Sequence, residues 1–255
     1  MMVALLVLGG QAAGETPNPS TPAAFIAAIE AAHGRDVFDS KQAIAMDYEG
    51  VWGGAKTNKA RFVIARDTSR VRAEYDDGTL VVWDGSEAWV SPTNSPLQAA
   101  RFHILTWPYF LLAPMKLGDP GSHLALLGTK SLQGNEFDAG KLTFDAGIGD
   151  APDDWYLVYR DPRSSRLKAM AYIVTYFASV ADAEKEVHAI TYDDFLTVEG
   201  VTFSTRWRFW NWSTEKGIHG DPIGEARVSN LRFLTPTPDT FRAPPDARPD
   251  PKPKP

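Results

Sequence analysis

The sequence predicts a mainly β protein, in which one antiparallel sheet curls into an open half-barrel that α-helices cap. Within residues 70–90, two Asp-Gly pairs separate three short predicted strands, and Asp-Gly is a strong β-hairpin signal. The first of these strands, residues 70–75, alternates apolar and charged residues. Residues 201–212 alternate in the same way, with an aromatic face that includes Trp207 and a polar face that carries Arg206 and Arg208. About eleven or twelve strands are predicted in all, which is more than a flat open sheet usually carries before it curls.

The composition permits one large domain and argues against several functional classes. A chain of 255 residues buries roughly 70% of its unfolded surface, which is ample for a single core. The net charge is −6 and the basic residues are scattered, so no surface for nucleic acid or an anionic membrane is predicted. Cysteine is absent, which excludes disulfides, thiolate metal sites and a cysteine nucleophile. The histidines lie far apart without the local spacing of a ligand pair, so no metal is expected, although a site assembled in space stays open. No other cofactor is expected, because the sequence has no phosphate-binding glycine loop or dinucleotide fingerprint.

Residues 1–14 resemble the end of a secretory signal peptide, because a short apolar run is followed by small residues at a possible cleavage site. The basic region that usually precedes such a run is missing, and a buried or disordered apolar tail is the alternative. We therefore expect a periplasmic or secreted protein. No membrane span is predicted elsewhere, since Pro108 and Pro114 interrupt the most apolar stretch, residues 102–117.

A helix is predicted between Pro22 and Gly34. Ser20 or Thr21 is suited to cap its start, proline is favoured in the first turn, and glycine is favoured at the end. Its narrow apolar stripe indicates that the helix lies against another element. The stripe comprises Phe25, Ile26 and Ile29.

Strands follow with little helix between them. In the first half they are expected over residues 42–52, 59–66, 70–75, 79–83 and 87–90, with a hairpin turn at Gly53-Gly54. In the second half they are expected over residues 123–130, 137–144, 154–160, 166–177, 186–196, 201–212 and 225–234. Turns are predicted at Asp161-Pro162, Glu199-Gly200 and Asp221-Pro222.

Two segments depart from this pattern. Residues 96–117 are predicted to form one or two short helices over the sheet, begun by Pro96 and Pro108, with Ser95 and Thr106 as nearby caps. Residues 235–255 are rich in proline and are expected to be an extended, disordered tail. A single half-barrel domain is therefore expected over residues 22–234.

Aromatic residues are the main candidates for a functional site. Packing in the core is the ordinary explanation for any one of them. However, a large curved sheet has more concave area than two short helices obviously fill, and an apolar cavity there suits a lipid. The aromatic set includes Trp83, Trp89, Trp107, Phe110, Trp155, Trp207 and Phe209.

Several motifs resemble the superfamily of periplasmic lipoprotein carriers, the LolA-like proteins. Residues 62–75 and 81–92 resemble its early strands, in which an Arg-x-Arg-x-Glu-Tyr strand leads into a Val-Val-x-Asp-Gly hairpin followed by tryptophan. Residues 159–162 and 192–201 resemble its paired return strands. The resemblance covers residues 22–234 and implies an unclosed antiparallel barrel that holds acyl chains in an apolar cavity.

The resemblance also implies roles for individual residues and partners. The implied ligand is a lipid or a lipoprotein acyl chain, an envelope protein is a possible partner, and the protein is not an enzyme. The implied lid comprises Phe25 and Ile29 on the first helix and Trp107, Phe110, Leu111 and Leu112 on the middle segment. The implied concave lining comprises Trp83, Trp89, Trp207 and Phe209.

Two other functions stay open at this point. The first is an envelope interaction or sensor domain whose core is filled by its own side chains, with the proline-rich tail as a tether. The second is a hydrolase that uses an acidic pair, with Asp153 or Asp194 as a member. Such an enzyme needs two carboxylates about 5–9.5 Å apart across a polar cleft.

Overall fold

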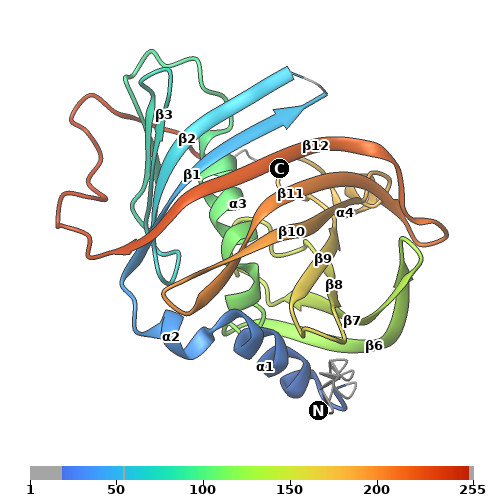
Figure 1. The fold of residues 1–255 in the computed structure, drawn as a ribbon. Coiled ribbons are helices and arrows are strands. Elements are labelled where there is room, and N and C mark those ends of the chain that lie inside the picture. Colours follow the sequence, from blue (N-terminus) through green and yellow to red (C-terminus); the bar gives the residue numbers. More distant parts are fainter. Residues whose placement is uncertain (1–18, 54, 253–255) are drawn as a thin grey trace, which may run out of the picture.

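The protein is one curved antiparallel sheet that wraps around a central helix, α3 (Ala100–Leu112) (Figure 1). The structure, a computed structural model, describes residues 19–53 and 55–252, so the predicted signal peptide at residues 1–14 lies outside the described residues. The first half of the chain contributes β1 (Ala43–Trp52), β2 (Ala55–Ala65), β3 (Val71–Tyr75), β4 (Leu80–Trp83) and β5 (Ala88–Ser91). The second half contributes β6 (Ser122–Leu132), β7 (Asn135–Phe144), β8 (Tyr156–Arg160), β9 (Leu167–Tyr172), β10 (His188–Val198), β11 (Val201–Ser213), β12 (Gly217–Leu234) and β13 (Arg248–Pro249).

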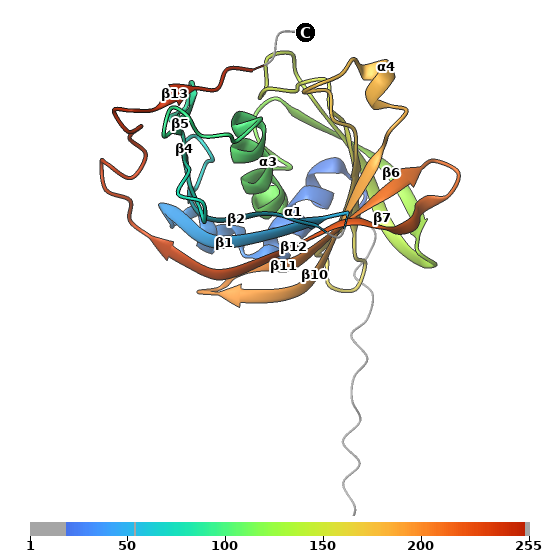
Figure 2. The ribbon, with the colours of Figure 1, turned by 90° about the horizontal axis from the view of Figure 1, so that it is seen from above.

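The order of the strands explains the shape. Neighbours run β13-β5-β4-β3-β2-β1-β12-β11-β10-β9-β8-β7-β6, so two meanders are joined where β1 pairs with β12. The described strands leave the sheet unclosed, with β13 at one edge and β6 at the other. Seen from above, the sheet curls around α3 (Figure 2). The predicted open half-barrel is confirmed.

Helices α3 and α1 (Pro22–His33) lie on the concave side of the sheet (Figure 2). The other helical elements are α2 (Arg35–Asp39), the short 3-10 turn η1 (Ala113–Met115) and α4 (Val180–Ala183), which lies at the rim. The hydroxyl of Thr21 accepts a hydrogen bond from the amide of Ala24, and Gly34 ends α1 with φ +82°, as predicted. A Cβ atom on Gly34 would lie 2.3 Å from the carbonyl oxygen of Gly200, so glycine is also required by this close approach. None of the described helices is both long and apolar enough to span a bilayer.

The middle segment forms one α-helix, which was one of the two predicted alternatives, followed by the short turn η1. It begins at Ala100, not at Pro96, and Pro108 lies inside it, where it removes a backbone donor without ending the helix. Neither Ser95 nor Thr106 caps it. The carboxylate of Asp250, from the C-terminal segment, accepts a hydrogen bond from the Arg101 amide at 2.9 Å and takes that role. Because both the sheet and the loops surround α3, its buried residues occupy most of its circumference.

Two further sequence predictions are wrong. The predicted turn at Asp221-Pro222 lies within β12, where the pairing of β12 with β11 shifts register, and proline is tolerated at such an irregularity. The described part of the C-terminal segment, residues 235–252, is extended but packed. Its Arg248–Pro249 pairs with β5, and its Phe241 is 6% exposed under the guanidinium of Arg70.

The apolar residues separate onto the two faces of the sheet. The large core lies between the concave face and the helices, and the alternation along β11 places Phe203, Trp207 and Phe209 in it. The polar face of β11 turns outward, where Arg206 pairs with Glu225. A second, smaller cluster lies on this other face of the sheet. It comprises Leu132, Ala139, Tyr159, Ala169, Ala171, Ala189, Trp210 and Trp212.

Candidate functional site

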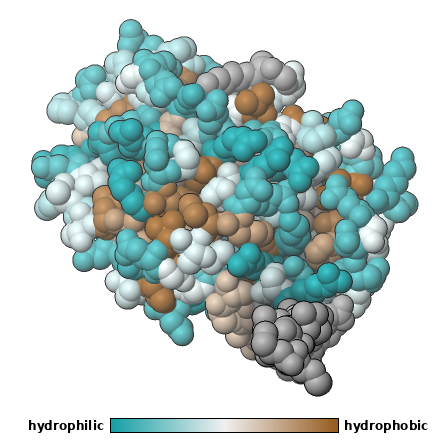
Figure 3. Space-filling view, viewed as in Figure 1, coloured by the Kyte–Doolittle hydropathy of each residue, from teal (hydrophilic) through white to brown (hydrophobic). Residues whose placement is uncertain are grey.

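A cavity of about 770 Å³ lies between α3, the concave face of the second half of the sheet and the loop between β7 and β8. This volume is within the range of sites that hold small organic ligands. Most of the lining side chains are apolar or aromatic. They include Trp52, Val71, Phe102, Ile104, Leu105, Trp107, Pro108, Phe110, Phe144, Ile148, Val174 and Phe209. On the face seen in Figure 1 hydrophilic residues surround the apolar patches (Figure 3).

Trp107 lies at the centre of a group of aromatic rings on one side of the cavity, called the aromatic wall below. The wall comprises Tyr48, Trp52, His103, Trp107 and Phe209. Trp107 points from α3 toward the sheet, where its ring stacks on Tyr48 with centroids 4.9 Å apart. The centroid of its ring lies 6.2 Å from that of Phe209 and 5.7 Å from that of the His103 imidazole. Trp52 stacks on Phe209 at 4.7 Å and extends the wall toward the ends of β1 and β11. Offset and edge contacts of this kind hold the rings in fixed positions, so the wall is preorganised.

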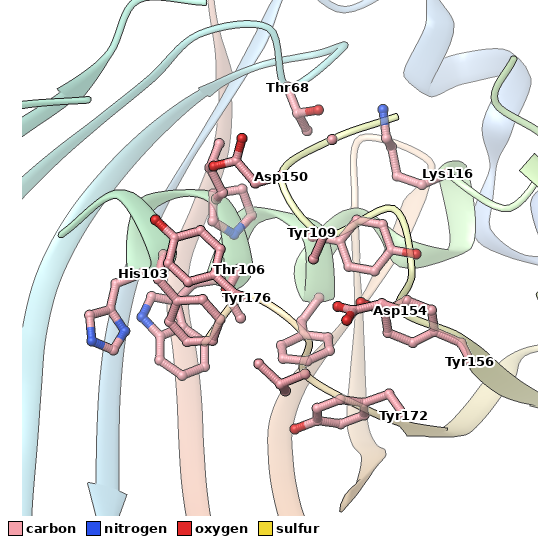
Figure 4. A pocket seen from close by; sticks show the side chains of 18 of the residues that line it. Thr68, His103, Thr106, Tyr109, Lys116, Asp150, Asp154, Tyr156, Tyr172 and Tyr176 are labelled. Atoms are coloured by element: carbon pink, nitrogen blue, oxygen red, sulfur yellow. The ribbon is translucent and has the colours of Figure 1, made fainter. Parts of the chain in front are cut away.

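One carboxyl group in the lining of this mainly apolar cavity, that of Asp154, lies among tyrosines (Figure 4). Its Oδ1 accepts hydrogen bonds from the amide and the hydroxyl of Thr175, both at 2.7 Å. Burial raises the pKa of Asp154 to about 6, although the two hydrogen bonds oppose the shift. The ring of Tyr156 lies 5.4 Å from that of Tyr109 and 5.9 Å from that of Tyr172. Burial raises the pKa values of all three phenols, which keeps them uncharged.

The ion pair between Arg101 and Asp150, called the latch below, holds the loop between β7 and β8 at the cavity. Residues 148–151 line the cavity, and both carboxylate oxygens of Asp150 accept from the guanidinium of Arg101, at 2.6 and 2.9 Å. Arg101 also lies 4.7 Å from the centroid of Trp83. The side chain of Phe177 is 57% exposed. The centroid of its ring lies 5.0 Å from that of Phe102, which lines the cavity. The cavity therefore has an apolar rim next to a latched loop.

Eight of the ten predicted site residues fall into three groups. Three of them line the cavity: Trp107, Phe110 and Phe209. Three others are buried in the core beside it: Leu111, Leu112 and Trp207. Phe25 and Ile29 are fully buried where α1 packs on the sheet and do not line the cavity. Their role in ligand binding stays a prediction.

Trp83 and Trp89 cannot both lie on the concave face, which corrects the predicted lining. Trp83 pairs with Ala88, and Val82 pairs with Trp89, so the two tryptophans are on opposite sides of the hairpin. Ala88 and Val90 face the core, whereas the indole of Trp89 donates to the carboxylate of Asp84 at 2.7 Å. Trp83 supports Arg101 at the latch.

The tyrosines, Asp154 and the Arg101–Asp150 pair were not singled out as site residues from the sequence. Asp153 is a candidate member of an acidic pair in the sequence, but nothing local shows whether its carboxyl group or that of the adjacent Asp154 points inward. The one local signal is alternation. Asp154 precedes Tyr156 by two residues, so on an extended segment both side chains point to the same side, and Tyr156 faces the core. The partners of Asp150 and Asp154, Arg101 and Thr175, are distant in sequence.

Within residues 19–53 and 55–252, no group of three or more histidine, aspartate or glutamate side chains is placed to hold a metal ion. The imidazole of His33 is instead structural: the Leu167 amide donates to Nε2 at 3.1 Å, so Nδ1 carries the proton and donates to the Thr202 carbonyl at 2.8 Å. This links α1 to β9 and β11.

The fold belongs to a known structural class, the open antiparallel half-barrels that enclose a helix. No protein-family model matches the sequence, and no curated protein matches it. Among solved structures, the chain is similar to a LolA superfamily protein from Nitrosomonas europaea, with a TM-score of 0.56, 10% identity, and 88% of this chain and 98% of that one covered. It is also similar to a putative outer membrane lipoprotein-sorting protein domain from Vibrio parahaemolyticus, with a TM-score of 0.52, 11% identity, and 87% and 97% covered. The predicted LolA-like fold is confirmed.

Proposed function

We propose that this protein is an exported, non-enzymatic binding protein that shields the acyl chain of a lipid or lipoprotein in its cavity. The observation that carries the proposal is the cavity of about 770 Å³ with its aromatic and aliphatic lining. Burial contributes about 0.8 kcal/mol per methylene, so a chain of a dozen carbons can bind without a charged partner. The latched loop and the exposed Phe177 at the rim suit entry of an apolar chain.

The other two functions have less support. A cavity of this size argues against a sensor domain whose core is filled by its own side chains. For a hydrolase, Asp153 and Asp194 are both exposed, and neither lines the cavity. Of the carboxylates that do line it, Asp150 is paired with Arg101 and Asp119 with Lys116.

Native mass spectrometry of protein purified from cell envelopes, followed by organic extraction, tests the proposal. A bound lipid or acyl peptide is the expected result. A clean apo mass, with no uptake when lipid is added, would contradict it.

A cavity-filling variant shows whether uptake occurs at this site. Thr106 lines the cavity from α3, and Thr106→Trp is expected to abolish the binding of a neutral fluorescent apolar probe. The matched control is Thr129→Trp, at an exposed position on β6, which should bind as the parent does. Equal binding by both variants would place the ligand elsewhere.

A further inference from the structure

One oxygen of the Asp154 carboxyl group, Oδ2, accepts no hydrogen bond from the described residues. Both hydrogen bonds that the carboxyl group accepts from the described residues, from the amide and hydroxyl of Thr175, end on Oδ1. Its Oδ2 is therefore an acceptor available to a ligand. Figure 4 shows the carboxyl among the rings of Tyr109 and Tyr156, inside the lining of the cavity.

Tyr109 supplies the complementary donor. Its hydroxyl is buried and has no hydrogen-bond partner among the described residues, although the side chain lines the cavity. A buried polar group without a partner is uncommon, because leaving it unpaired costs stability. An acceptor and a donor thus lie on neighbouring side chains of the cavity lining (Figure 4), and a ligand that displaces the atoms covering the Tyr109 hydroxyl can satisfy both.

The charges around these two side chains disfavour an anionic ligand. Asp154 lies beside Asp153, and the same cavity is lined by Asp119 and Asp150. The lysine in the cavity lining and the arginine of the adjoining ion pair are already paired, Lys116 with Asp119 and Arg101 with Asp150. A fatty-acid carboxylate at this position would lie next to like charge and away from water, which is strongly unfavourable.

We propose that Asp154 and Tyr109 form a head-group subsite that selects acyl chains with an uncharged, hydroxyl-bearing head over free fatty acids. A head-group hydroxyl donates to Oδ2 of Asp154, and an ester carbonyl accepts from the hydroxyl of Tyr109. This inference rests on the proposed function, because it presumes that the cavity holds an acyl chain.

The test compares three ligands that share one C16 chain: monopalmitoylglycerol, methyl palmitate and palmitate. Each displaces a neutral fluorescent apolar probe from the full-length protein at pH 8, where Asp154 is ionised. We expect monopalmitoylglycerol to bind roughly tenfold more tightly than methyl palmitate, the effect of one hydrogen bond to a charged group. Palmitate should bind more weakly than the methyl ester.

Two variants separate the subsite from the cavity. Asp154→Asn keeps an acceptor for Thr175 and removes the charge, so palmitate should gain about tenfold in affinity and the preference for the glycerol ester should shrink. Tyr109→Phe should weaken both esters. The matched control is Asp153→Asn, which removes the same charge from the adjacent, exposed position and should leave the order of affinities unchanged.

The outcomes distinguish the two proposals. If all three ligands bind equally to the parent protein, or if Asp154→Asn behaves as Asp153→Asn does, the head-group subsite is refuted while the acyl-chain cavity stands. If methyl palmitate does not bind at all, the proposed function fails and the subsite with it.

Discussion

The stability of the protein should depend on the protonation of one buried imidazole, His33. In the folded state its Nε2 accepts from the Leu167 amide, so a second proton would break a buried hydrogen bond between α1 and β9. Burial lowers the pKa of His33 from 6.5 to about 4, and the nearby Arg166 acts in the same direction. The unfolded chain therefore binds a proton at His33 at a higher pH than the folded protein does.

The sign and size of the effect follow from this difference. Because the unfolded state binds more protons between pH 6.5 and about 4, the free energy of unfolding falls as the pH is lowered through that window and levels off below it. Each pKa unit of difference between the folded and unfolded states corresponds to about 1.4 kcal/mol. Protonation of His33 should therefore lower the free energy of unfolding by about 2–3 kcal/mol between pH 7.5 and pH 4.5.

The assay is urea unfolding at four pH values in this range, for the parent and for His33→Gln. Glutamine does not titrate, so the difference between the two curves isolates the imidazole from the carboxylates that protonate in the same range. The variant should be less stable than the parent at pH 7.5, and that gap should narrow by about 2–3 kcal/mol at pH 4.5. His123→Gln, at an exposed position, is the matched control. Parallel curves for the parent and His33→Gln would refute the reasoning.

Three other substitutions test the latch, the sheet and the C-terminal segment. Arg101→Gln removes hydrogen bonds between charged groups, so hydrogen exchange over residues 145–151 should rise by roughly 10–100-fold, whereas Asp239→Asn, in an exposed pair, should leave it unchanged. Asp138→Ala leaves the fully buried guanidinium of Arg160 without its carboxylate and should cost about 3–5 kcal/mol in urea unfolding; a loss below 1 kcal/mol would show that water or a neighbour replaces the carboxylate. Phe241→Ala should cost about 3 kcal/mol by the same measurement, and a neutral result would mean that the C-terminal segment does not pack in solution.

Local patterns were enough to predict the architecture. Alternation and turn chemistry act over a few residues, so the hairpins, the strand β11 and the capped helix α1 could be read from the sequence. The turn at Glu199-Gly200 forms with positive φ at both residues, as a tight hairpin requires. Composition was misleading where tertiary contacts decide, because the prolines of the C-terminal segment are compatible with an extended edge strand.

The cavity itself could be predicted only as a class. Alternation identifies which residues share a face, and it correctly groups Trp207 with Phe209. It does not show that Trp207 is covered by neighbouring side chains while Phe209 reaches the cavity. The latch and the surroundings of Asp154 depend on pairs that are distant along the chain, such as Arg101 with Asp150, and no local pattern encodes such pairs.

The C-terminal strand β13 links the integrity of the chain end to the behaviour of the whole molecule. It occupies the edge of β5, which would otherwise present unpaired backbone groups to a neighbouring molecule. One residue further, Asp250 holds the start of α3 beside Arg101, at the latch. Proteolysis within residues 235–247 would therefore be expected to do two things at once: to loosen the entrance of the cavity and to create an adhesive edge that favours self-association.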